Sequence, residues 1–328
     1  MKSKYRNLFL LFGVAAIVVM LCTFDMKYDE LWANLKRAGY WFPVLMLLWL
    51  FIYFLNACAW YIIIRDDKQS HVPFGKVYKF TISGFALNYA TPMGLMGGEP
   101  YRIMELSPYV GTEKATSSVI LYVMMHIFTH ISFWFLSIFL YIALYPVDWM
   151  MGVLLTFIGT FCLLAIYFFF KGYKRGMAVK TLHLLQHIPY IRRWAKRFGE
   201  EKKEELARID SQISRLHGQH KRTFYGAFLL EMLGRLGGCL EVWLILNILT
   251  TDVSFPDCIL IMAFSSLFSN LFFFSPMQLG VREGGLALAV GGLSIPGAFG
   301  VFCGLITRVR ELLWIVIGVA LMKFGNKK

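Results

Sequence analysis

Charged residues are scarce in this sequence: lysine, arginine, aspartate and glutamate make up 16% of its 328 residues, whereas hydrophobic residues make up 58%. A soluble domain carries about 25% charged residues, so this composition excludes an ordinary soluble domain of this length. Several apolar stretches reach the roughly 20 residues that a helix needs to cross the hydrocarbon core of a bilayer. The composition therefore predicts an all-α polytopic membrane protein.

Motifs that mark common enzyme classes are also missing. The sequence contains no HExxH zinc motif, no GxSxG nucleophile motif and nothing that resembles a nucleotide-binding loop. Its six cysteines include no CxxC pair and mostly lie in or beside apolar segments, which favours unpaired thiols over disulfides or metal ligands. We therefore expect no metal and no cofactor, and we do not expect an enzyme.

Positive charge is concentrated in one long segment. Residues 171–222 contain 14 lysines and arginines against 5 aspartates and glutamates, a net charge of +9. Because apolar segments flank it on both sides, we interpret it as a cytoplasmic loop facing anionic headgroups and expect no nucleic-acid partner. Apolar residues recur at helical spacing from Trp194 to Leu216. This amphipathic helix would lie on the membrane surface or pack against the cytoplasmic ends of the spans.

The positive-inside rule orients the chain in an inner membrane, with both basic termini in the cytoplasm. Residues 7–24 are interpreted as a retained anchor, because this run is long for a signal peptide and no A-x-A-like site follows it. We predict about six full spans. They cover approximately residues 7–24, 40–64, 117–145, 150–170, 223–249 and 298–322.

Two further segments begin and end on the same side of the membrane. The chain is cytoplasmic at both Lys76 and Lys114, so residues 77–114 are predicted to form a re-entrant hairpin. Residues 257–297 begin and end outside, which predicts a second hairpin inserted from the opposite face. The single transmembrane domain of residues 1–328 would then contain an inverted-repeat-like pair of halves, 7–170 and 223–328.

The predicted tips of the two hairpins resemble each other. "TPMGLMGGE" (Thr91–Glu99) and "SPMQLGVRE" (Ser275–Glu283) share proline, methionine, leucine and glutamate in register. Proline and glycine break the helix, and a membrane tolerates the unpaired backbone only beside protein or a water-filled cavity. Interrupted segments in both halves indicate a transporter with a midplane site. The repeat is imperfect, since Asn88 and Asn270 do not align.

Ionised side chains gather around these tips and in the neighbouring spans. An arginine or carboxylate at mid-bilayer costs about 2.5–3.5 kcal/mol on insertion scales, so each is expected to face inward. The arginines could bind phosphate in a bidentate way. The alternative is structural ion pairing, as for Glu231 and Arg235 at i, i+4. The candidate substrate-binding residues are Arg102, Arg282, Arg308, Glu99, Glu283, Asn88, Asn270, Glu231, Arg235 and His126.

His126 and His130 stand four residues apart in an apolar segment. They could form a metal pair, although no third ligand is suggested nearby, or a hydrogen-bonded interior pair. A proton-sensitive role is the third alternative.

Three motifs resemble one known family. "GEPYR" (Gly98–Arg102) resembles the G-E-x-x-R step of the lysylphosphatidylglycerol synthetase transmembrane-region family, whose members are flippase-like integral membrane proteins. "SPMQLGVREGGLAL" is similar to its second signature, and "ITRVRELLW" to its arginine-bearing last span. The resemblance covers nearly the whole chain. It implies a domain that translocates phospholipid, aminoacylated lipid or a polyprenyl-phosphate carrier.

The sequence departs from the family pattern in two places. The family often carries an acidic–arginine pair where this chain has "LYVMMHIF", so His126 would replace a charged partner. The chain also stops at Lys328 without a soluble C-terminal domain, so it is not expected to aminoacylate lipid itself.

The leading hypothesis is a flippase that moves an anionic, phosphate-bearing lipid across the inner membrane. The headgroup would bind Arg102 and Arg282, with Arg308 as a further candidate, and rocking of one repeat against the other would open the cavity to each face in turn. One rival is an intramembrane lipid-modifying enzyme that uses Glu99, Glu283 and His126. Another is an accessory subunit of envelope glycolipid synthesis, with envelope-biosynthesis enzymes as partners.

Overall fold

The computed structural model describes residues 36–66, 72–90, 97–175, 204, 211, 221–250, 252–272 and 280–323. All regular secondary structure in these residues is helical, which confirms the all-α prediction. The helices are α3 (Trp41–Ile64), α4 (Phe74–Ala90), α5 (Gly98–Val110), α6 (Thr112–Leu144), α7 (Trp149–Arg175), α11 (Lys221–Leu246), α12 (Phe255–Leu271), α13 (Val281–Gly292) and α14 (Gly297–Lys323). The predicted span 7–24, most of loop 171–222 and most of both tip motifs lie outside the described residues.

Three of the described helices are long and apolar enough to cross a membrane. They are α3, α6 and the first 23 residues of α7, which at about 1.5 Å per residue each exceed a hydrocarbon core of about 30 Å. Helices α11 and α14 have 26 and 27 residues and are long enough, but their sequences carry several charges. These lengths fit a multi-pass membrane protein.

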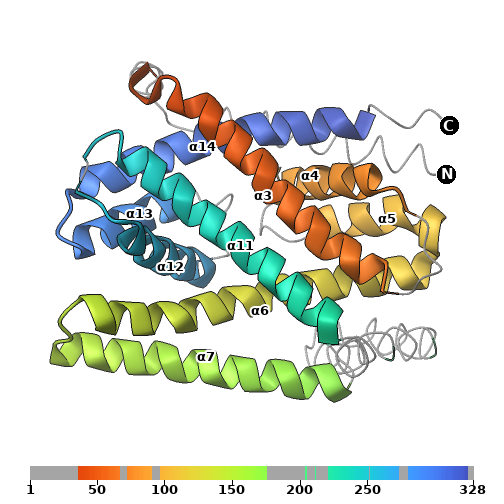
Figure 1. The fold of residues 1–328 in the computed structure, drawn as a ribbon, viewed down its shortest axis with the longest axis horizontal. Helices are drawn as coiled ribbons and strands as arrows, with labels where there is room; N and C mark the ends of the chain where they lie inside the picture. The colour runs from red at the N-terminus through yellow and green to blue at the C-terminus, as the bar shows by residue number, and fades with distance from the viewer. Residues whose placement is uncertain are drawn as a thin grey trace, which may run out of the picture.

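Helix α7 presents an apolar surface to the surroundings. Only 11% of its most hydrophobic stretch is buried, against 50% for α3, and large side chains such as Phe157, Phe161 and Phe168 are exposed. The helix packs mainly against α6, beside which it runs in Figure 1. An exposed apolar surface of this extent fits contact with lipid.

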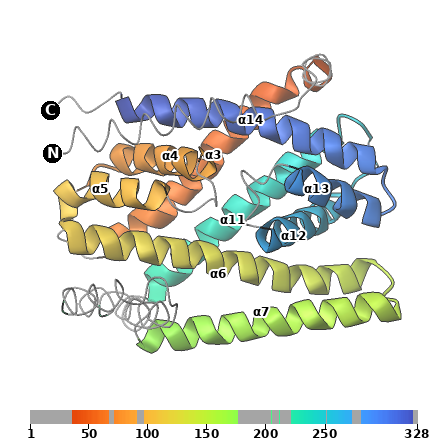
Figure 2. The ribbon, with the colours of Figure 1, turned by 180° about the vertical axis from the view of Figure 1, so that it is seen from behind.

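Two pairs of short helices occupy the segments predicted as hairpins. Helices α4 and α5 have 17 and 13 residues, and α12 and α13 have 17 and 12. Their lengths of about 18–26 Å fall short of a hydrocarbon core of about 30 Å. In Figures 1 and 2 the two pairs lie toward opposite ends of the long axis of the molecule.

Helix packing repeats between the two halves. Helix α3 contacts α4 and α6, as α11 contacts α12 and α14; α14 packs on α4, as α6 packs on α12. Helices α3 and α11 pack directly against each other, and α6 and α14 run in opposite directions in Figure 1. Exchanging α3–α6 with α11–α14 therefore preserves the pattern of contacts, as it would in an inverted repeat.

Glycines allow close contact between helices at two of these crossings. A Cβ atom on Gly318 of α14 would lie 2.4 Å from the Cβ of Ala86 on α4, and the Ser83 hydroxyl donates to the Gly318 carbonyl at 2.9 Å. A Cβ on Gly237 of α11 would lie 2.8 Å from a side-chain carbon of Ile52 on α3. In membranes, small residues at interfaces let helices gain packing contacts that lipid could not supply.

Substituting Gly318→Val is expected to destabilise the protein, because the added carbons overlap α4 in a contact that is already closed. Overpacking of this kind costs about 1–3 kcal/mol. The control is Gly159→Val on α7, where an added Cβ would make an ordinary 3.5 Å contact with Ile138. Thermal unfolding in detergent should show a lower midpoint for Gly318→Val alone; equal midpoints would contradict the assigned α4–α14 contact.

Candidate functional site

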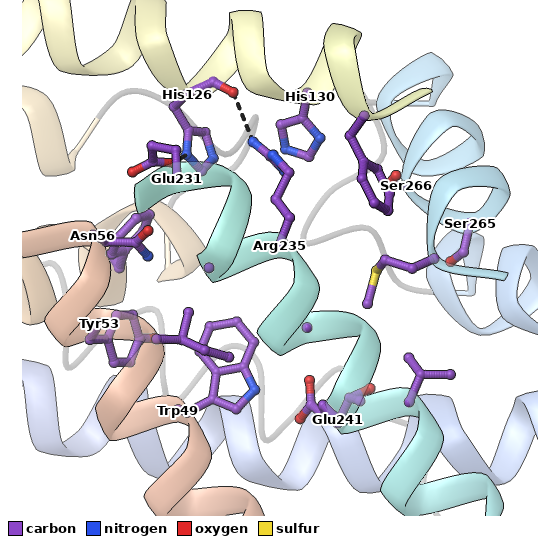
Figure 3. Close-up of a pocket in the computed structure, with 18 of the residues that line it drawn as sticks. Trp49, Tyr53, Asn56, His126, His130, Glu231, Arg235, Glu241, Ser265 and Ser266 are labelled. Carbon is purple, nitrogen blue, oxygen red and sulfur yellow. Dashed lines mark hydrogen bonds and ion pairs between the residues drawn. The ribbon is translucent and has the colours of Figure 1, made fainter. Parts of the chain in front are cut away.

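A cavity of about 210 Å³ lies between the two halves of the protein, with walls from both. Its wall includes four of the residues predicted from the sequence, namely His126, Glu231, Arg235 and Arg282. Aromatic rings of α3 and α4 complete one side. Figure 3 shows the α11 side chains Glu231, Arg235 and Glu241 arranged along this wall. The remaining predicted residues lie behind the wall or away from it.

Arg235 is the cavity arginine that lacks an acidic partner. Its Nη2 donates to the His126 backbone carbonyl at 2.8 Å, and its Nε has no hydrogen-bond partner among the described residues. No described carboxylate lies within ion-pair distance of it, although Glu231 stands one turn earlier on α11. In Figure 3 the guanidinium extends from α11 toward His126 and His130. Arg235 can therefore still accept an anion.

Glu231 is engaged elsewhere. Its Oε2 lies 2.7 Å from Nδ1 of His126, and its side chain is 1% exposed. The two histidine rings have centroids 5.2 Å apart, and Nδ1 of His130 has no partner among the described residues. The structure therefore places His126 against an acid, and His130 beside the unpaired nitrogen of Arg235.

Three arginines and three glutamates form a neutral network at one side of the cavity. It joins α13, α14 and α11: Arg282 pairs with Glu311, while two nitrogens of Arg308 lie 3.0 and 3.1 Å from Glu283. Arg310 makes two hydrogen bonds, of 2.8 and 3.0 Å, to Glu241. Arg308 and Arg310 also approach Glu311 at 3.6 and 3.7 Å. The three positive and three negative charges of this network compensate one another.

Arg282 differs from the other two network arginines in its access to the cavity. Its side chain is 25% exposed, against 5% for Arg308 and none for Arg310. Arg310 lies 3.8 Å from the centroid of the Trp49 ring, which covers it. Of the three, only Arg282 lines the cavity and could contact a ligand without a change in the helices.

Arg102, at the first hairpin, is enclosed by aromatic rings and is 1% exposed. Its guanidinium carbon lies 4.7 Å from the centroid of Phe85, 5.3 Å from that of Tyr122 and 5.7 Å from that of Trp60. Cation–π contacts of this kind stabilise a desolvated arginine. In this structure Arg102 joins α3, α4, α5 and α6 and does not face the cavity.

Asn88 and Glu99 link the two limbs of the first hairpin. Asn88 donates to Glu99 at 2.8 Å and accepts from the Gly98 backbone N–H at 2.8 Å, while Glu99 lies 3.8 Å from Arg102. A Cβ on Gly98 would lie 2.2 Å from the Gly84 carbonyl oxygen, so glycine is required at this crossing. Asn88 therefore stabilises the hairpin close to its tip.

Asn270 has no corresponding role in the second hairpin. It is exposed and donates to the Ser266 carbonyl one turn earlier on its own helix, at 2.8 Å. Glu283 instead holds the start of α13, because its Oε2 accepts from the Gly280 backbone N–H at 3.0 Å while its Oε1 pairs with Arg308. The two hairpins are thus secured by different residues.

Several residues of the cavity and network were missed by the sequence-based selection. Glu241, Arg310 and Glu311 carried a usable signal, since each is a charge inside a predicted span, but nothing local indicated which charges meet. Asn56 and Tyr89, which line the cavity, carried no signal because isolated polar residues are common in helices.

The described residues contain no group of three or more histidine, cysteine, aspartate or glutamate side chains that could hold a metal ion. His126 faces Glu231. The wall of the cavity presents guanidinium, imidazole, carboxylate and hydroxyl groups.

The Arg310–Glu241 pair offers a test of the network. Arg310→Met would leave Glu241 buried without its partner, which costs about 3–5 kcal/mol. Arg310→Met combined with Glu241→Leu should recover much of that loss, because both charges are then absent. The exposed Arg65→Met serves as the control. Thermal unfolding in detergent compares the wild type with these three variants. A double variant that is no more stable than Arg310→Met would contradict the pairing.

Comparison with known protein families supports the membrane assignment. Residues 9–319 match the family described as "Lysylphosphatidylglycerol synthase TM region". Comparison with curated proteins and with solved structures gave no match. The match covers nearly the whole chain and relates this multi-pass membrane protein to lipid synthesis and flipping. The chain belongs to the lysylphosphatidylglycerol synthase TM region family.

Proposed function

We propose that this protein is a lipid flippase that carries a phosphate-bearing lipid across the inner membrane, with the headgroup bound to Arg235. The single observation that carries the proposal is the state of that residue: a guanidinium in the cavity wall with an unpaired Nε and no acidic partner among the described residues. Phospholipids, aminoacylated lipids and polyprenyl phosphates share the phosphate group that this site would recognise.

Charge explains why an anion is the fitting ligand. A cation inside a membrane protein is costly unless it is compensated, and the neighbouring carboxylates are already committed to His126 and to the three network arginines. A phosphate oxygen would give Arg235 the direct anionic contact that it lacks among the described residues. Guanidinium groups bind phosphate through two parallel hydrogen bonds.

Arg282 is proposed as the second contact to the headgroup. It lines the same cavity and keeps a quarter of its side chain exposed, although it is paired with Glu311. Because Glu311 also lies near Arg308 and Arg310, it could release Arg282 to a phosphate and remain neutralised. Arg102, Arg308, Glu99 and Glu283 would then position the helices around the site.

The two short helix pairs are proposed to be re-entrant hairpins that enter from opposite faces, as about six spans and cytoplasmic termini require. Half-length helices at both ends of a molecule with repeated packing support this. Rocking of one half against the other about the α3–α11 contact would expose the cavity to each side in turn. The proposed activity is translocation and requires no chemical change in the lipid.

Substituting Arg235→Gln is expected to slow translocation by about 10- to 100-fold, since charge-assisted hydrogen bonds contribute about 1.5–3 kcal/mol. Arg235→Lys should retain part of the rate because it keeps the charge. The assay follows NBD-labelled phosphatidylglycerol in proteoliposomes by its accessibility to dithionite. Arg222→Gln, an exposed arginine on the same helix, is the matched control.

The outcomes separate the proposal from its rivals. Equal rates for Arg235→Gln and wild type would remove Arg235 from the mechanism. No translocation by the wild-type protein, together with a chemically altered lipid recovered from the vesicles, would support a lipid-modifying enzyme instead.

A further inference from the structure

The geometry points to a second ligand site, an apolar groove between α6, α7, α12 and α13, as the place where an acyl or prenyl chain of the transported lipid lies. The inference rests on the proposed function, since it assigns the tail of the lipid whose headgroup binds at Arg235. The groove has a volume of about 290 Å³.

The wall of this groove is almost entirely hydrocarbon. Leucine, isoleucine, alanine and phenylalanine side chains from four helices line it, together with Trp134 and Tyr141. Its wall includes no charged residue among the described ones, in contrast to the cavity, where four charged side chains meet. Such a surface favours a hydrocarbon ligand and offers a phosphate nothing to bind.

Helix α12, together with α6 and α13, lines both the groove and the polar cavity. Met262 and Ser265 face the cavity, whereas Ala263 and Leu267 face the groove. Between the two, the Trp134 indole N–H of α6 donates to the Ser266 hydroxyl of α12 at 2.9 Å. An amphiphilic molecule would therefore find a polar compartment and an apolar one on two sides of the same helix.

Trp134 also connects the two compartments through aromatic contact. Its ring centroid lies 5.6 Å from that of His130, which lines the cavity beside Arg235. Trp134 thus faces the tail groove with its ring and contacts the headgroup cavity through Ser266 and His130. The glycerol or first prenyl unit of the lipid would lie near this residue.

The groove is accessible from the lipid phase because α7 makes its main contact with α6. Large apolar side chains at its margin, such as Leu154, Phe264 and Leu288, remain exposed. A chain could enter sideways between α7 and the α12–α13 pair without leaving hydrocarbon, while its headgroup stays in the cavity.

The test fills the groove without disturbing the helix that forms it. A Cβ atom on Gly292, which lines the groove, would meet nothing within 4 Å, and the same holds for its neighbour Gly291, which is not part of the wall. Both are exposed residues of α13. Gly292→Phe is therefore the groove-filling variant, and Gly291→Phe is its matched control.

Two readouts are needed on the full-length protein in proteoliposomes. The first is translocation of NBD-labelled phosphatidylglycerol. The second is photolabelling by phosphatidylglycerol that carries a diazirine in one acyl chain, with the labelled peptides mapped by mass spectrometry. We expect label on α7 and α12 residues of the groove in the wild type. Gly292→Phe should lower both label and translocation by about tenfold, and Gly291→Phe should lower neither.

Each result either supports or overturns the inference. If Arg235→Gln lowers the labelling of the groove, the result supports a lipid whose tail and headgroup are bound at the same time. Undiminished translocation by Gly292→Phe would overturn the groove assignment. If Arg235→Gln is defective in the same assay, the proposed function is still supported. If the groove is labelled but the wild-type protein translocates no lipid, the inference is overturned, because the groove then holds a lipid that is not transported. A changed oligomer size for Gly292→Phe would overturn it by assigning the groove to a second copy of the chain.

Discussion

Compensation of buried charge is the constraint on which this structure depends. Arg310, with no exposed side-chain surface, donates two hydrogen bonds to Glu241, which stands 69 residues earlier in the sequence. The same requirement draws Glu311 toward three arginines and fastens α13 and α14 to one another. Because breaking a buried pair costs far more than forming it contributes, the network defines how the second half assembles.

Against this background, Arg235 stands out because no described carboxylate lies within ion-pair distance of it, although Glu231 stands one turn earlier on α11. The contrast with Arg102 is instructive, because Arg102 is stabilised by Glu99 and by three aromatic rings and is closed to ligands. Arg235 lies instead in the wall of a cavity, next to an unpaired histidine nitrogen. The two arginines thus differ in what already surrounds them, and this difference is the basis of the binding role proposed for Arg235.

Helix α12, together with α6 and α13, separates the polar cavity from the apolar groove, since each of these helices lines both. Helix α12 turns Ser265 and Ser266 toward the cavity and Ala263 and Leu267 toward the groove. The side chain of Asn88 links α4 to α5 in the first half. In the second half, the asparagine of α12 donates instead to a backbone carbonyl of its own helix. The two halves thus combine repeated helix packing with different local contacts.

The sequence by itself determined the helical membrane class, the family and the presence of intramembrane charges, because hydropathy and a few motifs report those properties locally. The proline and glycine breaks also marked both short helix pairs, since a broken helix is a backbone property of adjacent residues. Only the tertiary structure decided which charges meet. Glu231 and Arg235 stand in good order for an i, i+4 pair, yet His126 from α6 takes the acid and leaves the arginine open. Contacts between helices far apart in sequence settle such competitions, and no local pattern encodes them.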